Sequence, residues 1–259
     1  MWISCKSTTG GAIYTNHAGS TLGVISCYFE DCYASTDFGG AIATEGLNTV
    51  HIFSSSFVLC HGEIIPNPDS GGGAVYITAT SNYQQIDAST FINCYSGADG
   101  GAVLYRYSTV TGTDGIVDTK IIGCRSTFEN MGVQAGAMQS YGGYLTSSLS
   151  NCLISKCSSI YGGGLYLLVK GNSVTNIIAF CFFSDNSATS TGNDVTLESF
   201  STNYNQFFLC SCSTSPSCRV AYYVSSWIDL DDNWLFLTYN KIDLYAELTN
   251  KSTYSTQDQ

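Results

Sequence analysis

Apolar and polar residues alternate over short stretches of this chain. In residues 25–30 (ISCYFE), one face carries Ile25, Cys27 and Phe29, and the other carries Ser, Tyr and Glu. A period of two is typical of a half-buried β-strand, whereas the three- and four-residue apolar spacing of a helix does not occur between the glycine clusters. The pattern predicts strands of about five or six residues, separated by turns.

A turn of small residues recurs with a period of about thirty residues. Its regular form is Gly-Gly-Ala followed by a large apolar residue, and the last copy has decayed to Gly-Asn-Asp-Val at 192–195. A glycine permits positive φ at a corner, or a close backbone approach that a Cβ would block. Replacing Gly40 by Val is therefore expected to cost roughly a few kcal/mol. The candidate turn glycines are Gly10, Gly11, Gly39, Gly40, Gly72, Gly73, Gly100, Gly101, Gly136, Gly162 and Gly163.

A second marker precedes each turn and keeps the same period. A large apolar residue, such as Trp2 or Phe29, is followed three positions later by a small residue, which is Cys in six of seven copies. Two markers that stay in phase predict a structural repeat in which like residues stack on like. The predicted ladder consists of Cys5, Cys32, Cys60, Cys94, Cys124, Cys157 and Asn186.

A parallel β-helix, or β-solenoid, explains both markers. About seven rungs of about thirty residues, stacked about 4.8 Å apart, would form a rod on the order of 35 Å long. We expect the repeats over 1–200, then the last rungs, an irregular C-terminal cap and a polar tail over 201–259. Five residues before each ladder position after the first we expect a second inner column of small residues: Cys27, Ser55, Ser89, Thr119, Cys152 and Cys181.

The GGAI turn and the F-x-x-C strand end, a variant of F-x-x-N, resemble the repeats of polymorphic outer membrane proteins. The chain is most similar to the cysteine-rich versions among surface proteins of parasitic protists, over roughly residues 1 to 200. The resemblance implies a right-handed parallel β-helix of the pectin-lyase-like fold. It also implies a cell-surface or extracellular location and an adhesion or antigen role.

Cysteine replaces the usual ladder asparagine here, and only Asn186 keeps it. An asparagine ladder would hydrogen-bond along the rod, whereas thiols act mainly as small apolar fillers. We therefore interpret the ladder thiols as buried packing. Cys210, Cys212 and Cys218 are a candidate disulfide site if the protein is secreted, because they lie past the regular repeats in a predicted Ser-rich turn. Zinc is disfavoured, since paired C-x-x-C elbows are missing.

Charge limits the partners. The net charge of −11, with nine Lys and Arg residues scattered along the chain, argues against nucleic acid. No stretch is long and apolar enough to predict a membrane span, and no secretory signal is visible. Because the chain starts inside a rung, at Trp2 and Cys5, we expect a truncated N-terminus.

Catalytic motifs are not recognisable. His17, His51 and His61 lie on different rungs, and no nucleophile elbow, P-loop or dinucleotide fingerprint occurs. The acids do not line up as the paired carboxylates of a glycosidase would. Asp87 breaks the inward pattern, which indicates either an error in the assumed register or a functional carboxylate. The two densest acidic spots are Asp185, Asp194 and Glu198 on the last clear rung, and Asp229, Asp231 and Asp232 further on. For the second spot, a solvated strand edge or cap is the favoured interpretation and calcium binding the alternative.

We therefore predict a non-catalytic surface or interaction protein, whose partner is an unknown protein or glycan, and no cofactor or metal. The alternative is a carbohydrate-active enzyme, a polysaccharide lyase or glycoside hydrolase, for which Arg106, Lys120 and Arg125 are the nearest basic residues. An ice-binding solenoid is a third hypothesis. The Thr-x-Thr pairs that motivate it occur at different offsets from the glycines, which predicts no flat threonine array. The only glycosylation sequon begins at Asn250.

Overall fold

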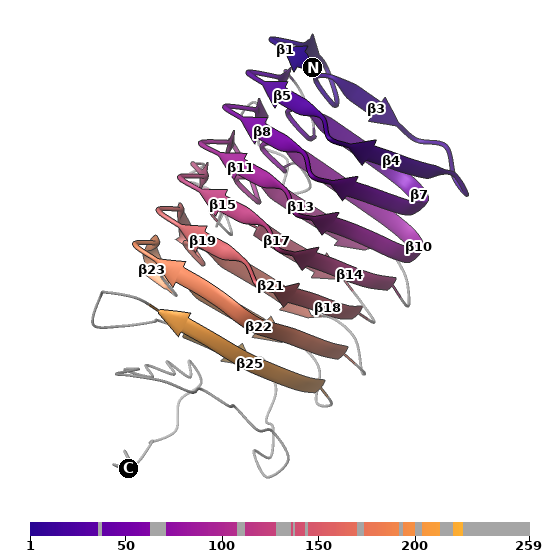
Figure 1. Ribbon diagram of the computed structural model, residues 1–259. Helices are drawn as coiled ribbons and strands as arrows, with labels where there is room; N and C mark the ends of the chain where they lie inside the picture. The colour runs from indigo at the N-terminus through magenta and orange to yellow at the C-terminus, as the bar shows by residue number, and fades with distance from the viewer. Residues whose placement is uncertain are drawn as a thin grey trace, which may run out of the picture.

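The computed structural model is an all-β parallel solenoid, which confirms the predicted fold class (Figure 1). Its strands join into a 19-stranded sheet and a 7-stranded sheet, and every pairing between named strands is parallel. The structure describes residues 1–35, 38–62, 71–107, 112–127, 136, 138–142, 145–169, 174–191, 194–199, 204–212 and 220–224.

Each turn of the coil begins with a short strand, and the apolar residues Phe29, Phe57 and Phe91 of these strands are fully buried. These strands are β1 (Trp2–Ile3), β5 (Tyr28–Glu30), β8 (Ser56–Val58), β11 (Thr90–Ile92), β15 (Lys120–Ile122) and β19 (Leu153–Ser155), continued by the ends of β22 (Val174–Ser184) and β25 (Tyr204–Cys212). The registers align the first marker of the sequence in one column: Trp2, Phe29, Phe57, Phe91, Ile121, Ile154, Phe183 and then Cys212.

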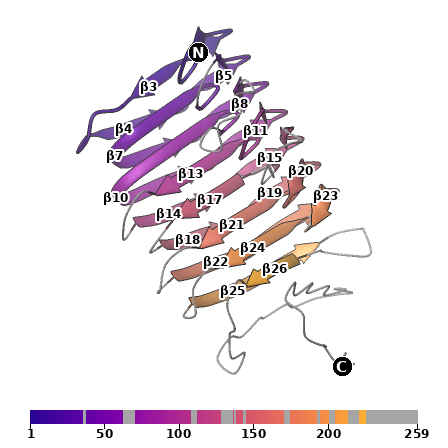
Figure 2. The same ribbon diagram turned by 180° about the vertical axis from the view of Figure 1, so that it is seen from behind.

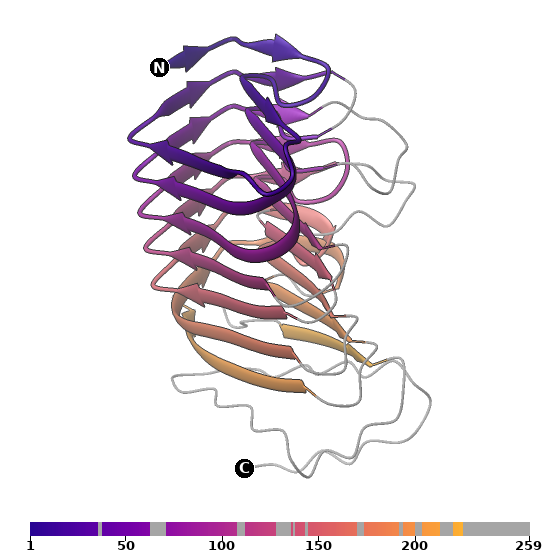
Figure 3. The same ribbon diagram turned by 90° about the vertical axis from the view of Figure 1, so that its right-hand side faces the viewer.

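After a corner, the chain enters the 7-stranded sheet. Its strands are β2 (Lys6–Ser7), β6 (Tyr33–Ala34), β9 (His61–Gly62), β12 (Tyr95–Ser96), β16 (Arg125–Ser126), β20 (Ser158–Tyr161) and β23 (Ser187–Thr191). In the side view of Figure 3, the strands of one turn run around the coil before the chain steps down to the next turn.

Longer strands complete each turn (Figure 2). One set lies after the glycine turn: β3 (Ile13–Thr15), β13 (Val103–Tyr107), β17 (Met138–Gly142), β21 (Leu165–Val169), β24 (Val195–Ser199) and β26 (Val220–Val224). The next set is β4 (Thr21–Ile25), β14 (Gly112–Val117) and β18 (Leu145–Ser150), followed by β22 and β25, while β7 (Ile42–Phe53) and β10 (Val75–Asp87) run through both sets.

Two corners of each turn use left-handed backbone at residues that are mostly not glycine. One corner directly precedes the ladder position and the other directly precedes the second inner column, with φ between +47° and +66°. The first set is Ser4, Asp31, Leu59, Asn93, Gly123, Lys156 and Asp185, and the second is Ser26, Ser54, Ala88, Asp118, Asn151 and Phe180.

These corners break the alternation that the sequence pattern assumed. Val24 is buried and Cys27 packs against the core, but Ile25, between Val24 and the corner at Ser26, is 62% exposed. The prediction that Ile25 shares a face with Cys27 is therefore wrong. Asp87 aligns with Phe53, which in turn aligns with Ile25, so its supposed inward position was a register error.

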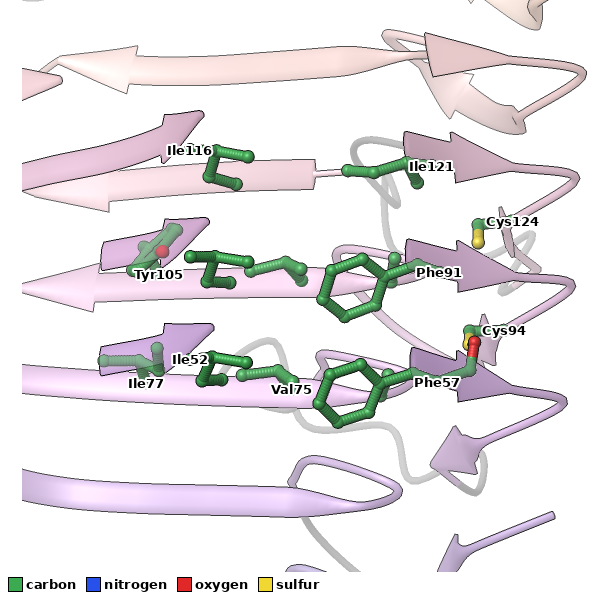
Figure 4. Close-up of a cluster of buried hydrophobic side chains, with 14 of the residues drawn as sticks. Ile52, Phe57, Val75, Ile77, Phe91, Cys94, Tyr105, Ile116, Ile121 and Cys124 are labelled. Atoms are coloured by element: carbon green, nitrogen blue, oxygen red, sulfur yellow. The ribbon is translucent and has the colours of Figure 1, made fainter. Parts of the chain in front are cut away.

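The core runs along the inside of the coil. Phe29, Phe57 and Phe91 stack face to face, with ring centroids 4.8 and 4.7 Å apart, and Figure 4 shows Phe57 and Phe91 one above the other. Each of the three rings is 0% exposed. Aromatic stacking therefore adds to the burial of apolar surface along the rod.

Candidate functional site

The first glycine of each pair forms a third left-handed corner. Gly10, Gly39, Gly72, Gly100 and Gly162 have φ between +56° and +70°. A Cβ at any of them would collide with the carbonyl group of the residue three positions later. Glycine avoids this clash and tolerates the positive φ, so the turn closes at these positions.

The second glycine of each pair serves a different purpose, which is close approach. At Gly40, a Cβ would lie less than 3.0 Å from the carbonyl oxygen of Gly73 and from the backbone of His61. On the other rungs, a Cβ would meet the carbonyl oxygen of the next second glycine and the backbone of a strand in the 7-stranded sheet. This holds at Gly11, Gly73, Gly101 and Gly136, and for Gly136 the carbonyl oxygen belongs to Gly163. This glycine column therefore lets the strands of the 7-stranded sheet pack closely against the glycine turns.

The ladder cysteines lie inside the coil. From Cys32 to Cys157 they are buried, Cys5 is half-buried at the first rung, and the nine cysteines whose side chains the structure describes are free thiols. Each ladder Sγ faces the carbonyl oxygen two residues earlier, at 3.6 Å for Cys32 and 3.3 Å for Cys157. Weak thiol donors thus partner carbonyl groups of the corner.

Asn186 makes stronger contacts at the same ladder position. Its Oδ1 accepts the N–H of Cys157 at 2.9 Å, and its Nδ2 donates to the carbonyl of Ile154 and to Asp194 Oδ1, each at 2.9 Å. Asp194 is itself buried, whereas Asp185 is exposed at its corner. Asp194 is thus part of the packing around Asn186.

Stacking and burial suppress thiol ionisation at Cys32, Cys124 and Cys152. The hydrogen bond to Cys60, together with burial, raises the pKa of the Cys32 thiol well above its usual value. Burial raises the pKa of Cys124, with a contribution from Cys157, and the contact with Cys181 together with burial raises that of Cys152. At neutral pH these groups are protonated, so they are poor nucleophiles and poor metal ligands.

The repeat continues beyond the point where its glycine marker ends. Cys210 aligns in register with Cys181, and Cys212 aligns with Phe183, both at the end of β25. Placing these two cysteines in a turn past the repeats was therefore wrong, because strand pairing persists there without the Gly-Gly-Ala turn. Cys218 lies outside the described residues, and the disulfide stays a prediction. Asp229, Asp231, Asp232 and Asn250 lie outside them as well.

Within the described part of the chain, no carboxylate aligns in register with a carboxylate on an adjoining rung. Asp87 aligns with Phe53 and Val117, and Glu45 aligns with Thr78. Asp118 accepts a hydrogen bond from Asn151. Among the described residues, no group of three or more His, Cys, Asp and Glu side chains is arranged to hold a metal ion.

The most distinctive surface feature is a column of large side chains on the 7-stranded sheet. It consists of Lys6, Tyr33, His61, Tyr95 and Arg125, which the registers align one per rung. We call these five residues the outer column. The Tyr33 and His61 ring centroids are 4.5 Å apart, and those of His61 and Tyr95 are 4.6 Å apart.

Cations cover both ends of this aromatic stack. Lys6 Nζ lies 4.7 Å from the ring centroid of Tyr33, and the Arg125 guanidinium carbon lies 5.4 Å from that of Tyr95. Both distances are within the range of a cation–π contact. The two cationic side chains are exposed and the three rings are half-buried, so the ring edges are the part that faces solvent.

Sequence reasoning missed the outer column, although a signal for it exists. Each member directly follows a ladder cysteine, from Cys5-Lys6 to Cys124-Arg125. His61 belongs to no local motif along the chain, and only its constant offset from the ladder cysteine connects it with the other members. Lys6, Tyr33, Tyr95 and Arg125 would have been found with His61 at that offset.

A second constant offset reveals a threonine column. Six residues before the second inner column, the registers align Thr21, Thr49, Tyr83, Thr113, Thr146 and Thr175. The prediction of no flat threonine array considered only Thr-x-Thr pairs, so it did not identify this single column. The position two residues further along each strand aligns Gly23, His51, Gln85, Gly115, Ser148 and Ile177, so no second threonine column accompanies the first at this position.

Comparison of the chain with protein families, with curated proteins and with solved structures gave no match. Within the residues that the structure describes, no helix has the length and apolar character needed to cross a membrane.

Proposed function

We propose that this chain is a non-catalytic β-helix protein that acts as an interaction surface, of the adhesin or surface-antigen kind. The outer column carries this proposal, because it holds five large side chains in register on one exposed sheet. A solenoid presents such a column to a partner as an extended strip, which suits a long ligand better than a small substrate.

Two further observations support a surface role. Only 11% of residues are charged, so the solvent-facing positions are mostly neutral and polar. The GGAI and F-x-x-C repeats resemble those of polymorphic outer membrane proteins, which favours a place at the cell surface or outside the cell. The partner would be a protein or a glycan there.

The enzymatic alternative gains no support from the register. A glycosidase needs two carboxyl groups across one scissile bond, about 5 to 10 Å apart. Glu45 and Asp87 instead have non-acidic neighbours on both adjoining rungs where the registers extend, and Asp118 is engaged by Asn151. No observation therefore favours a second function.

Binding and turnover can be measured on the same samples. The purified chain would be applied to glycan arrays and to cultured cells, and incubated with the same polysaccharides while reducing ends and new unsaturated ends are assayed. We expect saturable binding and no product. Cleavage that follows the protein through purification would overturn the proposal, as would failure to bind any glycan, protein or cell.

A further inference from the structure

Four of the five described cations lie on or next to the 7-stranded sheet of an acidic protein. Five Lys and Arg side chains lie in the described residues: Lys6, Arg106, Lys120, Arg125 and Lys156. Lys6 and Arg125 end the outer column, and Lys120 lies on the same rung as Arg125, across one corner from it. Lys156 occupies that corner on the next rung, and all four of these side chains are exposed. Arg106, on β13, belongs to a different face.

The aromatic rings between the cations also suit an anion. An aromatic ring is negative over its faces and positive at its edge. In the outer column the faces of Tyr33, His61 and Tyr95 are covered by one another and by the two cations. The positive ring edges therefore face the solvent side of the column, where a ligand would approach, and the His61 Nδ1 lies 3.3 Å from the carbonyl oxygen of Leu59.

Carboxylates lie at the margins of this surface and two of them are engaged by hydroxyl groups. Glu30 accepts from the Tyr28 hydroxyl, and Asp31 accepts from the Ser4 hydroxyl. Asp185 follows Lys156 in the corner column, one rung beyond it. Asp118, which accepts a hydrogen bond from Asn151, is exposed two residues before Lys120. Arg125, Lys120 and Lys156 thus form the densest group of described cations, with Asp118 and Asp185 beside it.

We propose that the outer column, together with Lys120 and Lys156, binds a linear sulfated glycan. This inference rests on the proposed interaction function and names its ligand class. Four register steps separate Lys6 from Arg125, or about 19 Å at the usual strand spacing, so an extended chain lying along the rod would contact both. The cluster of three cations suits sulfate groups, which are dense and permanently charged, and Arg pairs well with such planar or tetrahedral anions.

The test is binding of a heparin-derived oligosaccharide, compared with the same backbone after chemical desulfation. We expect saturable binding of the sulfated probe that weakens steeply with added salt, and at least tenfold weaker binding of the desulfated one. The variant K120Q/R125Q/K156Q should lose at least tenfold in affinity. The matched control is Arg106→Gln, which removes one positive charge from another face and should keep the wild-type affinity.

Several results would overturn the inference. Equal binding of the desulfated probe would exclude the sulfate assignment, and an unchanged affinity of the triple variant would exclude the site. Thermal unfolding of the variants must match the wild type, and Tyr95→Phe, which keeps the ring, gives a second folded probe that should weaken binding only severalfold. If the wild type binds cells or neutral glycans but not the sulfated probe, the proposed function stands and this ligand is wrong.

Discussion

Two stacks of side chains run along the same rungs, one inside the coil and one outside it. The inner stack of Phe29, Phe57 and Phe91 has centroid spacings of 4.8 and 4.7 Å, and the aromatic part of the outer column has spacings of 4.5 and 4.6 Å. Their geometry is nearly the same, but the inner rings are 0% exposed while the outer ones keep their edges in solvent.

The comparison teaches that rung spacing alone does not assign a role to a stacked residue. Inside, each ring buries its full apolar surface, and its loss would leave a cavity. Outside, the stack contributes mainly ring–ring contacts, and its chemistry changes from Lys to aromatic to Arg along the rod. We infer that the inner stack holds the fold and the outer one is available for recognition.

The largest expected effect comes from Gly40, which packs against the backbone of the outer column at His61. Gly40→Ala would push a methyl group against the carbonyl of Gly73 and the backbone of His61, which belong to the next rungs. Because backbone on two sides would have to move, we expect a loss on the order of 4–5 kcal/mol in the free energy of unfolding. Denaturant titration followed by circular dichroism measures it.

Gly62→Ala is the matched control for this substitution. A Cβ at Gly62 meets nothing within 4 Å, and the same column carries Ala34 and Ser96 on the adjoining rungs. We expect unchanged stability or a gain of about 0.4–1 kcal/mol. Equal changes in stability for the two variants would contradict the idea that the second glycine column lets the 7-stranded sheet pack closely.

A pair of substitutions on one rung compares the stacks directly. Phe57→Ala should cost about 3–5 kcal/mol, since a fully buried ring is removed from a packed column. His61→Ala, four residues later, should cost about 1 kcal/mol or less, because it removes only half-exposed stacking. Unfolding midpoints of the two variants provide the measurement, and equal losses would contradict the division of roles.

The thiols of the inner columns predict a gradual loss of stability at alkaline pH. The ordinary thiol pKa is 9.0, and it is raised in the folded chain for Cys32, Cys124 and Cys152. Their contribution is fully present below about pH 9 and declines above it, because the unfolded chain then releases protons that the folded chain retains. Each thiol would contribute about 1.4 kcal/mol per pH unit.

Stability measured from neutral to alkaline pH, with and without Cys124→Ser, isolates this contribution from that of tyrosine and lysine. Serine keeps a hydroxyl donor of similar size and does not ionise, as Ser55 and Ser89 illustrate in the second inner column. We expect the variant to show a shallower alkaline slope than the wild type. A slope identical to the wild type would mean that Cys124 ionises freely in the folded protein.

The sequence predicted the parts of this fold that repeat at a fixed offset. Gly-Gly-Ala and F-x-x-C report a backbone corner and an inward ring, which constrain the residue type strongly, so the columns of Phe57 and Cys60 were visible without coordinates. The left-handed corners were missed because Leu59, Ala88 and Phe180 have no local preference for that backbone. Tertiary pairing holds them there, and the alternation around Asp87 was misassigned as a result.

The surface site was harder to predict for a related physical reason. Outward residues are under weak steric constraint, so their identity drifts from rung to rung, and no single motif marks Lys6 or Arg125. The last rungs were predicted past residue 200, but Cys210 and Cys212 were placed in a turn because β25 continues the coil without its glycine turn. Both errors arose because a fixed sequence motif was expected, whereas the fold keeps only the position of a residue within the repeat.

The left-handed corners give this solenoid room for sequence divergence. Serine, aspartate, leucine, alanine, asparagine, lysine and phenylalanine all occupy the same backbone geometry, and several of these side chains are exposed, such as Leu59 at 46% and Phe180 at 71%. The register is held by the residues that follow each corner. Point mutations at the corners can therefore change the chemistry along the edges of the coil without changing the residues of its interior.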